Sequence, residues 1–371
     1  MIEKIRSIEK QIQLQQIFPA EKIFTGTKWL TNHSIIVEDD IIVDVIATPT
    51  NESTNKPINK ILVPAFIDIQ IYGAHEKLFA VYPEADSLFK LYDYCSKGGA
   101  FYFCPTIATN TIDVFYNGID AVKDYWQQGG KGCVGLHLEG PWLNPMKRGA
   151  HIEYIIHPPT LDEVKELLAY GKDVIKIITI APEVCSDEVI DYIQSQNILI
   201  SAGHSNATYH QATTAFDKGI KTATHLFNAM SGLQHREPGM VGALFNHATA
   251  KASIVPDGYH VDFAAVKIAK KMMQERLFVI TDAVTQTNEG YYPHQLAGDK
   301  YESNGILSGS ALTMIKAVKN LVDYCDIELA EALRMCSLYP AQLLGLNDLG
   351  KIEKGMKASF IELDETLNII N

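Results

Sequence analysis

The chain has 371 residues, of which 47% are hydrophobic and 20% are charged, and this globular composition excludes a disordered protein. At about 150 residues per domain, the length allows one large domain and a small one. The formal net charge of −12 excludes nucleic acid as a partner, because such a field repels a phosphate backbone, and any phosphate-bearing ligand must then be captured by local cationic side chains.

The cysteines and the N-terminal stretch both favour the cytoplasm. The six cysteines include no Cys-x-x-Cys pair and no spacing typical of a zinc cage or a disulfide framework. The first twenty residues alternate charged residues with Ile and Leu, unlike a secretory signal, and no uncharged apolar run of about 18 residues occurs. We expect a soluble, cytoplasmic chain without a membrane contact, and we interpret the stretch before Lys22 as a short helical extension.

Short strands separated by turn signals follow in residues 22–62. The strand candidates are residues 22–26, 34–40 and 41–47, and a polar loop follows over residues 48–60. At the other end of the chain, residues 350–364 read as two more strands joined by a turn. We expect residues 1–61 and 348–371 to form one small β-sandwich domain together.

From Ile61 onward the pattern alternates between apolar strands and amphipathic helices. The eight strand candidates are residues 61–71, 99–108, 133–140, 174–182, 198–204, 221–227, 251–258 and 277–283. Helix-period segments between them include residues 160–171, 186–196, 207–219 and 263–275. No glycine-rich dinucleotide fingerprint follows the first strand, which counts against a Rossmann domain. The pattern predicts an α/β fold with a (β/α)₈ TIM-like barrel over residues 62–347.

Polar residues that end the apolar runs are the candidate catalytic groups, because a (β/α)₈ barrel gathers its chemistry at the carboxyl ends of its strands. Glu139 ends the third strand, His204 the fifth, His225 the sixth and Asp282 the eighth. Any one of them could be a satisfied polar residue or a helix cap. Two imidazoles and a carboxylate are together the ligand set of an open catalytic metal site, with Asp282 left over as a base.

Several long blocks of the sequence resemble one family. The blocks are GLHLEGPWLNPMKRGAH at 135–151, GHSNATY at 203–209, THLFNAMSGLQHREPGMVGA at 224–243, DGYH at 257–260, TDA at 281–283 and SGSALTM at 308–314. In this order they are similar to the N-acetylglucosamine-6-phosphate deacetylases of the amidohydrolase superfamily, and the resemblance runs from about Lys22 to Asp364.

The resemblance implies a role for each residue at the strand ends. Glu139, His204 and His225 match the family's metal ligands, which implies one divalent ion per subunit, with zinc first and iron, cobalt or manganese as alternatives. Asp282 matches the aspartate that takes a proton from the attacking water and passes it to the leaving amine. His151 matches a position that assists at the developing oxyanion.

The resemblance also implies a substrate site for an amino-sugar phosphate. Arg236 matches a phosphate-binding arginine, although a surface ion pair with Glu237 or another carboxylate is the plainer alternative. The remaining substrate positions implied by the family are Gln70, Ala150, Asn228, Ala229, Asp257, His260, Leu307, Ser308 and Gly309. Of these, the backbone at Asn228 and Ala229 would approach the phosphate, and Leu307 to Gly309 would line the acetamide side.

The first barrel strand departs from a common amidohydrolase pattern. Gln70 and Tyr72 stand where many superfamily members place a His-x-His pair for a second metal, so a one-metal site follows. The loop from Tyr72 to Lys77 is also divergent, and we interpret its His75 and Glu76 as exposed. His137 is interpreted as a partner lying below the metal, and His235 as loop structure.

The sequence therefore predicts a metal-dependent amidase that converts N-acetyl-D-glucosamine 6-phosphate to D-glucosamine 6-phosphate and acetate. Three alternatives stay open: the same reaction on the galactosamine epimer, a non-catalytic sugar-phosphate sensor, and hydrolysis of a cyclic amide. An intact Asp282 weighs against the sensor, and the residues at positions 70 and 72 weigh against the cyclic amide. The family also implies a homodimer, in which the segment carrying Arg236 could reach across the interface.

Overall fold

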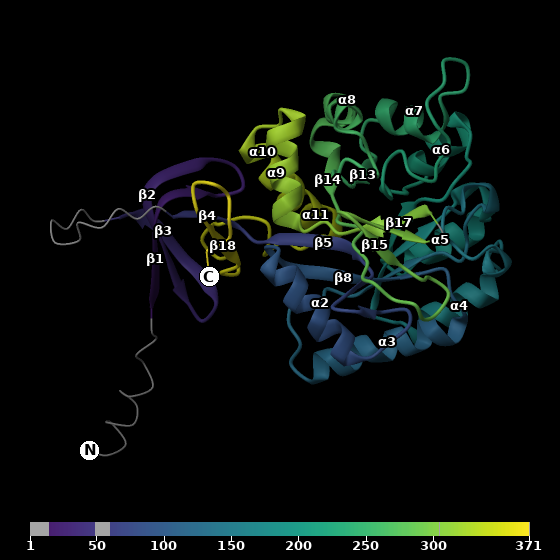
Figure 1. Ribbon diagram of the computed structural model, residues 1–371, viewed down its shortest axis with the longest axis horizontal. Coiled ribbons are helices and arrows are strands. Elements are labelled where there is room, and N and C mark those ends of the chain that lie inside the picture. Colours follow the sequence, from purple (N-terminus) through teal and green to yellow (C-terminus); the bar gives the residue numbers. More distant parts are fainter. Residues whose placement is uncertain (1–14, 49–59, 304, 371) are drawn as a thin grey trace.

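The computed structural model describes residues 15–48, 60–303 and 305–370. Figure 1 shows a small β domain, formed by the two ends of the described chain, beside a larger part in which helices surround a sheet. Most of the expected polar loop, residues 49–59, and residues 1–14 of the expected N-terminal extension lie outside the described residues.

The small domain is one five-stranded sheet with the order β18-β4-β1-β2-β3. Its strands are β1 (Gln16–Phe24), β2 (Trp29–Glu38), β3 (Ile41–Ala47), β4 (Ile61–Pro64) and β18 (Phe360–Leu363). The sheet curls, because Ile41 on one edge forms a bridge with Lys357, which lies just before the strand at the other edge. The two layers of the expected sandwich are thus parts of one sheet, and they enclose a separate apolar core.

Three local predictions for this domain are wrong. Residues 16–21, expected to be helical, form the first part of β1, because they pair with residues 33–37 of β2 in a long antiparallel ladder. The strand expected over residues 61–71 is interrupted at Ala65, and its first part, β4, joins the small sheet. The tail contains one strand, β18, where two were expected, because residues 355–358 bond with β3 as an irregular segment.

The larger part confirms the predicted (β/α)₈ barrel. Its sheet contains β5 (Phe66–Ile71), β8 (Ala100–Ala108), β9 (Leu136–Glu139), β10 (Ile175–Ile180), β11 (Leu199–Ala202), β12 (Thr222–Ala223), β13 (Lys251–Ile254) and β14 (Leu277–Val279). Neighbouring strands are parallel throughout. A parallel bridge between Ile71 and Ala283 closes the barrel, and the Asp282 amide donates to the Gln70 carbonyl at 3.0 Å.

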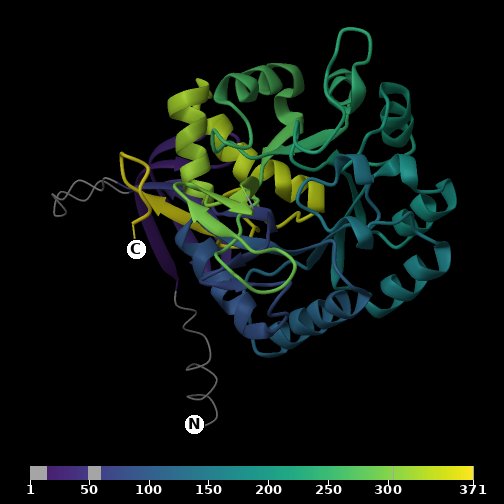
Figure 2. The ribbon, with the colours of Figure 1, turned by 45° about the vertical axis from the view of Figure 1, so that its right-hand side comes forward.

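Helices cover the outside of the barrel, as Figure 2 shows. They are α2 (Ala85–Lys97), α3 (Ile112–Gln127), α4 (Leu161–Tyr170), α5 (Asp187–Ser195), α6 (Tyr209–Asp217), α7 (Gly239–Asn246), α8 (Phe263–Met273), α9 (Met314–Cys325), α10 (Leu329–Cys336) and α11 (Leu338–Leu344). Helix α4 is representative, because Val164, Leu167 and Leu168 bury one face and a capping box between Thr160 and Glu163 starts it. Within the described ranges, no helix is long and apolar enough to cross a membrane.

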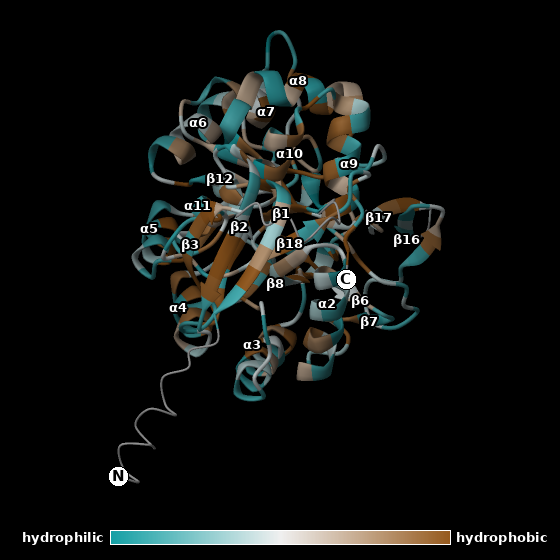
Figure 3. Cartoon of the chain, turned by 90° about the vertical axis from the view of Figure 1, so that its left-hand side faces the viewer, coloured by the Kyte–Doolittle hydropathy of each residue, from teal (hydrophilic) through white to brown (hydrophobic). Residues whose placement is uncertain are grey.

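Two small sheets beside the barrel were not predicted from the sequence. One is the hairpin of β6 (Gly73–Ala74) and β7 (Lys77–Leu78), and the other consists of β15 (Gln295–Ala297), β16 (Lys300–Ser303) and β17 (Ile306–Ser310). The three-stranded sheet belongs to the connection from β14 to α9. Figure 3 colours the chain by hydropathy and shows β3 as a hydrophobic strand on the outside of the small domain, where Ile41 and Ile46 are exposed.

A buried carboxylate joins the first and last strands of the barrel. Asp68 on β5 accepts hydrogen bonds from the amide and the hydroxyl of Thr281, which follows β14. Burial raises the pKa of Asp68 to about 7, although the hydrogen bonds from Thr281 oppose the rise. The unfolded value is about 3.9, so the folded chain binds a proton that the unfolded chain has released. Stability from this group is therefore lost as the pH rises from about 4 to about 7.

Replacing Asp68 by Asn should remove this pH dependence, because the amide does not titrate and can still bond with Thr281. We expect the free energy of unfolding of the wild type to fall relative to Asp68→Asn between pH 5 and pH 8, by at most about 3 kcal/mol. Urea unfolding of both proteins at the two pH values measures the difference. Parallel pH profiles would contradict this assignment.

Candidate active site

A cavity of about 220 Å³ lies at the carboxyl ends of the barrel strands. Glu139 from the end of β9, His204 after β11, His225 after β12 and Asp282 after β14 all line it. Its other walls are formed by Tyr72, Leu78, Ala80, Ala108, Gly149, Ala150, His151, Asn228, Ala229, His260, Val284, Tyr292, His294, Leu307 and Ser308. The four residues selected from the strand ends thus meet in one place, as the barrel geometry predicted.

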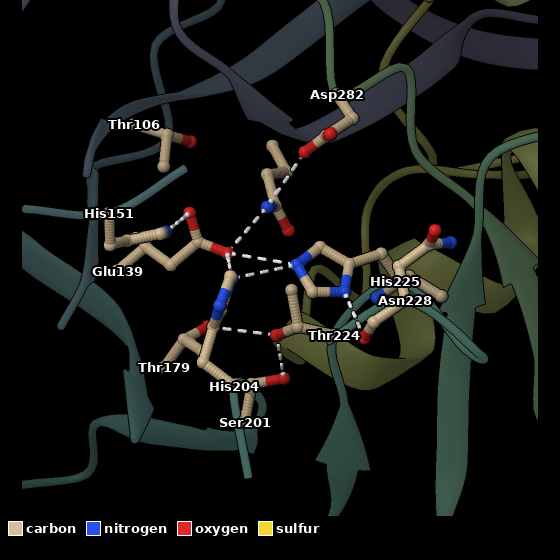
Figure 4. Close-up of polar contacts among 12 residues, drawn as sticks. Thr106, Glu139, His151, Thr179, Ser201, His204, Thr224, His225, Asn228 and Asp282 are labelled. Carbon is tan, nitrogen blue, oxygen red and sulfur yellow. Dashed lines mark hydrogen bonds and ion pairs between the residues drawn. The ribbon is translucent and has the colours of Figure 1, made fainter. Parts of the chain in front are cut away.

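Three potential ligand atoms point toward one another in this cavity (Figure 4). Oε1 of Glu139 lies 3.3 Å from Nε2 of His204 and 3.2 Å from Nε2 of His225, and the two Nε2 atoms are 3.1 Å apart. Ligands at about 2.0–2.1 Å from a tetrahedral zinc ion lie roughly 3.4 Å from each other. The spacing of the three atoms therefore fits a single metal ion.

Backbone carbonyls fix the tautomers of both histidines. Nδ1 of His204 lies 2.9 Å from the Lys147 carbonyl oxygen, and Nδ1 of His225 lies 3.1 Å from that of Asn228. A carbonyl only accepts, so the ring proton must be at Nδ1 and each Nε2 must carry a lone pair. When both rings are neutral, two lone pairs and a carboxylate oxygen therefore face one another, and a cation between them makes this arrangement favourable.

His151 belongs to an alternative ligand group, because ligand atoms of Glu139, His151 and His204 also lie within 4.8 Å of one another. Nδ1 of His151 lies 2.8 Å from the Thr109 hydroxyl and accepts from the Thr109 amide at 3.4 Å, and Nε2 lies 3.3 Å from Oε2 of Glu139, a carboxylate oxygen that can only accept. An imidazole that accepts at Nδ1 carries its proton at Nε2. This tautomer favours His225 as the third ligand and leaves His151 as a hydrogen-bond donor.

Three of the four strand-end residues adopt an unfavourable backbone conformation. The φ angle is +46° at His204, +36° at His225 and +55° at Asp282. Non-glycine residues in the left-handed region cost of order 1–3 kcal/mol each, and such residues cluster at active sites. The strain turns each side chain sharply off the end of its strand and into the cavity.

The surroundings give the buried groups different protonation states. Burial by itself would raise the pKa of Glu139, yet His151 and His204 hold it well below its usual range. Burial lowers the pKa of His204 to about 4, which keeps this ring neutral as a ligand must be. For His225, burial lowers the pKa but contact with Glu139 outweighs it and raises the pKa. An ion at this site would therefore compete with a proton on His225.

Asp282 is buried beside the three ligand atoms without contacting them directly. Nε2 of Gln70 donates to its Oδ1 at 2.9 Å, and Nε2 of His260 lies 3.5 Å from its Oδ2. Asp257 orients His260 through a contact of 2.6 Å to Nδ1. Burial raises the pKa of Asp282, although His260 and His225 oppose the rise. A carboxylate with a raised pKa can both accept and return a proton near neutral pH.

The structure brings most of the expected substrate residues to the cavity. Ala150, His151, Asn228, Ala229, His260, Leu307 and Ser308 line it. Gln70 lies between Glu139 and Asp282, where its amide nitrogen contacts both carboxylates. Asp257 and Gly309 lie one step back: Asp257 bonds with His260, and Gly309 is the neighbour of Ser308.

Arg236 is the expected substrate residue that the single chain does not bring to the cavity. It is exposed, on the loop between β12 and α7, and does not line the cavity walls. In the part of the chain that the structure describes, the expected alternative of an ion pair with Glu237 is absent. The neighbouring His235 is also exposed, in agreement with its interpretation as loop structure.

The other tempting histidines lie away from the ligand atoms. His75 is exposed and pairs with Asp93 at 2.9 Å, as expected for a surface loop. His137 is buried, with its nitrogens 3.0 Å from the Ile69 carbonyl oxygen and 2.8 Å from the hydroxyl of Thr179. The hydroxyl of Thr179 in turn contacts that of Thr224, directly before His225, at 2.8 Å.

Sequence reasoning missed the role of Tyr72 and the walls formed by the connection after β14. The Tyr72 hydroxyl donates to Oε2 of Glu139 at 2.5 Å. The sequence feature that could have pointed to Tyr72 is its position in place of a histidine of the His-x-His pattern. Tyr292 and His294 also line the cavity, and the pKa of His294 is lowered to about 4 by burial. No motif indicated these two residues.

Comparisons with known proteins match nearly the whole chain. The amidohydrolase family matches residues 61–370. An N-acetylgalactosamine-6-phosphate deacetylase of Escherichia coli O157:H7 is 30% identical, covering 96% of this chain and 97% of its own length. An N-acetylglucosamine-6-phosphate deacetylase of Haemophilus influenzae is 33% identical, covering 94% and 95%. A mutant N-acetyl-D-glucosamine-6-phosphate deacetylase from Mycobacterium smegmatis, in complex with N-acetyl-D-glucosamine-6-phosphate, has a TM-score of 0.88 at 26% identity and covers 96% of each chain.

The tautomer argument predicts which histidine binds metal. His225→Asn should lose bound metal to well below one ion per chain, because it removes one of two imidazole lone pairs. His151→Asn should keep about one ion, because it removes a donor and not a ligand. Metal content after dialysis, measured by mass spectrometry on both variants, separates the two ligand groups. The opposite result would assign the third ligand to His151.

Proposed function

The chain belongs to the amidohydrolase family, and from this premise we propose that it is a metal-dependent hydrolase that deacetylates N-acetyl-D-glucosamine 6-phosphate to D-glucosamine 6-phosphate and acetate. The observation that carries the proposal is the convergence of Glu139, His204 and His225 on one point, with Asp282 beside them in the same cavity. The activities of the relatives support this substrate class.

Five residues of the cavity have a defined part in the proposed reaction. A divalent ion held by Glu139, His204 and His225 would polarise the acetamide carbonyl and make water more acidic. The Asp282 carboxylate takes a proton as water adds to the carbonyl carbon, and returns it to the nitrogen as the carbon–nitrogen bond breaks. Protonation matters because an amine leaves poorly as an anion. His151 lines the cavity, and its Nε2 proton, which faces Oε2 of Glu139 at 3.3 Å, would also stabilise the developing oxyanion.

We propose zinc as the ion, with iron, cobalt or manganese as alternatives. Two imidazoles and one carboxylate suit zinc well, but the same set also accepts the other three ions, so availability decides among them. Gln70 and Tyr72 are poor ligands for such ions, which supports a single ion per chain.

The galactosamine epimer is the alternative substrate, because relatives of similar identity carry either activity. A non-catalytic sensor is disfavoured because a binding protein has no need of Asp282 poised beside a metal site.

Asp282→Asn tests the chemistry. We expect its turnover of N-acetyl-D-glucosamine 6-phosphate to fall about 10²–10⁴-fold, because the variant lacks the proton acceptor. Acetate release is measured for the gluco and galacto phosphates and for the unphosphorylated sugar, on protein loaded with one metal ion per chain. Faster turnover of the galacto substrate would select the alternative. A metal-loaded wild type without turnover of any of these sugars would favour the sensor.

We further propose that the protein is a homodimer in which Arg236 reaches the phosphate of a substrate held by the partner chain. The net charge of −12 requires a local cation for an anionic substrate, and Arg236 is exposed and outside its own cavity. Leu233 on the same loop is 57% exposed, as suits a residue covered by a second chain. A guanidinium fork also suits phosphate oxygens.

Mixing two impaired variants, assayed at a substrate concentration well below the wild-type KM, tests this arrangement. Arg236→Ala should raise the KM for the phosphorylated sugar about 10–100-fold, as expected for a lost hydrogen bond to a charged group. In a hybrid dimer of Arg236→Ala and Asp282→Asn, one site would have both residues intact if Arg236 acts across the interface. Random re-pairing should then restore about a quarter of the wild-type activity. Absence of any gain on mixing would place Arg236 in its own chain's site.

We also propose a cytoplasmic location. All six cysteines are free thiols, and five of them are buried, which suits a reducing compartment.

A further inference from the structure

We propose that Tyr72 determines how Glu139 holds the metal ion: its hydroxyl occupies one carboxylate oxygen, so that only the other can act as a ligand. Tyr72 is then a positioning residue, acting through Glu139. The inference rests on the proposed metal site but does not depend on which sugar is the substrate.

The two oxygens of Glu139 have different partners. Oε1 faces Nε2 of His204 and Nε2 of His225, at 3.3 and 3.2 Å, and also accepts from the Gln70 amide at 3.1 Å. Oε2 points the other way, where it accepts from the Tyr72 hydroxyl at 2.5 Å and lies 3.3 Å from Nε2 of His151. The two oxygens therefore differ: Oε1 faces both imidazoles of the proposed metal site, and Oε2 is held by Tyr72.

The direction of the Tyr72 hydrogen bond is determined by Gln70. The amide nitrogen of Gln70 lies 2.7 Å from the Tyr72 hydroxyl oxygen and can only donate to it. The phenolic proton is left with Oε2 of Glu139 as its acceptor. A hydroxyl that donates to a carboxylate at this distance forms a charge-assisted bond, which is about twice as strong as a neutral one.

The position of Tyr72 is fixed by the closure of the barrel. Its amide donates to the Ala283 carbonyl at 2.9 Å, and its carbonyl accepts from the Phe79 amide at 2.8 Å. Its ring packs against a small apolar cluster that contains Leu78 and Val284. A hydroxyl carried on so constrained a side chain can hold Oε2 in place.

A carboxylate held in this way keeps a coordination position open. An ion held by one oxygen of Glu139 and by two imidazoles would have three protein ligands and would keep a position for water or substrate. Without the hydroxyl, Oε2 would keep only the longer contact with Nε2 of His151 and could turn toward the ion as a second donor. Many superfamily members have, at the position of Tyr72, a histidine for a second metal. In this chain the residue at that position would instead restrain Glu139, a ligand of the single ion.

Tyr72→Phe removes the hydroxyl and keeps the ring. We expect metal affinity, measured by competition with a chelator, to fall about 10–100-fold, as for other lost partners of metal ligands. We also expect weaker visible absorption from the cobalt-loaded variant than from the cobalt-loaded wild type, because a second oxygen donor raises the coordination number above four. A purely structural role for Tyr72 would leave this spectrum unchanged.

Tyr292→Phe is the matched control, because it removes another hydroxyl from the same cavity, one that donates to the Thr109 carbonyl at 2.5 Å. We expect it to keep both the affinity and the spectrum. If Tyr72→Phe does not fold, Tyr72→Leu, which suits the apolar surroundings, carries the same prediction. Wild-type affinity and spectrum in a folded Tyr72 variant would overturn the proposal, as would a wild type that binds no metal. Metal binding without deacetylation would instead count against the proposed function alone.

Discussion

Three atoms with electron pairs to donate, one each from Glu139, His204 and His225, face one another across 3.1–3.3 Å in a buried cavity. The arrangement depends on two backbone carbonyls, those of Lys147 and Asn228, because they hold the ring protons on the far side of each imidazole. In the absence of a cation the three atoms repel, so the fold stabilises a site that only an ion completes. The barrel can hold these three atoms close together, because the residues are positioned by three different strands.

Carboxylates near this point have different roles because their surroundings differ. Imidazoles hold the pKa of Glu139 low, so it stays ionised as a ligand. Burial dominates at Asp282 and raises its pKa, which suits a group that accepts and returns a proton. Asp68 accepts hydrogen bonds from the backbone amides of Gln70 and Thr281. These bonds join the first barrel strand to the segment that follows the last one. One amide side chain, that of Gln70, donates to both Glu139 and Asp282.

The walls of the cavity are formed partly by residues at the strand ends and partly by residues of the segments that connect strands and helices. Strand ends supply the chemistry, whereas the three-stranded sheet after β14 supplies His294, Leu307 and Ser308 as a cover. Arg236, the cation proposed for the phosphate, is exposed and lies outside the cavity of its own chain. Chemistry and recognition are thereby separated, with the second depending on assembly in the proposed dimer.

The sequence by itself determined the barrel and the residues at its strand ends, because alternation of strands and helices and the position of a polar residue after an apolar run are local patterns. Local patterns also misled: residues 16–21 became a strand only because β2 offered a partner. Tertiary structure alone decided that the Tyr72 hydroxyl bonds to Glu139, because the two residues are 67 positions apart in the chain. The residue type of Tyr72 indicated only that it is a poor metal ligand. Tertiary structure likewise decided the proton position on His151, which depends on the Thr109 amide from another strand's end. The spacing of residues in the sequence does not predict such contacts, because these residues come together only when the barrel closes.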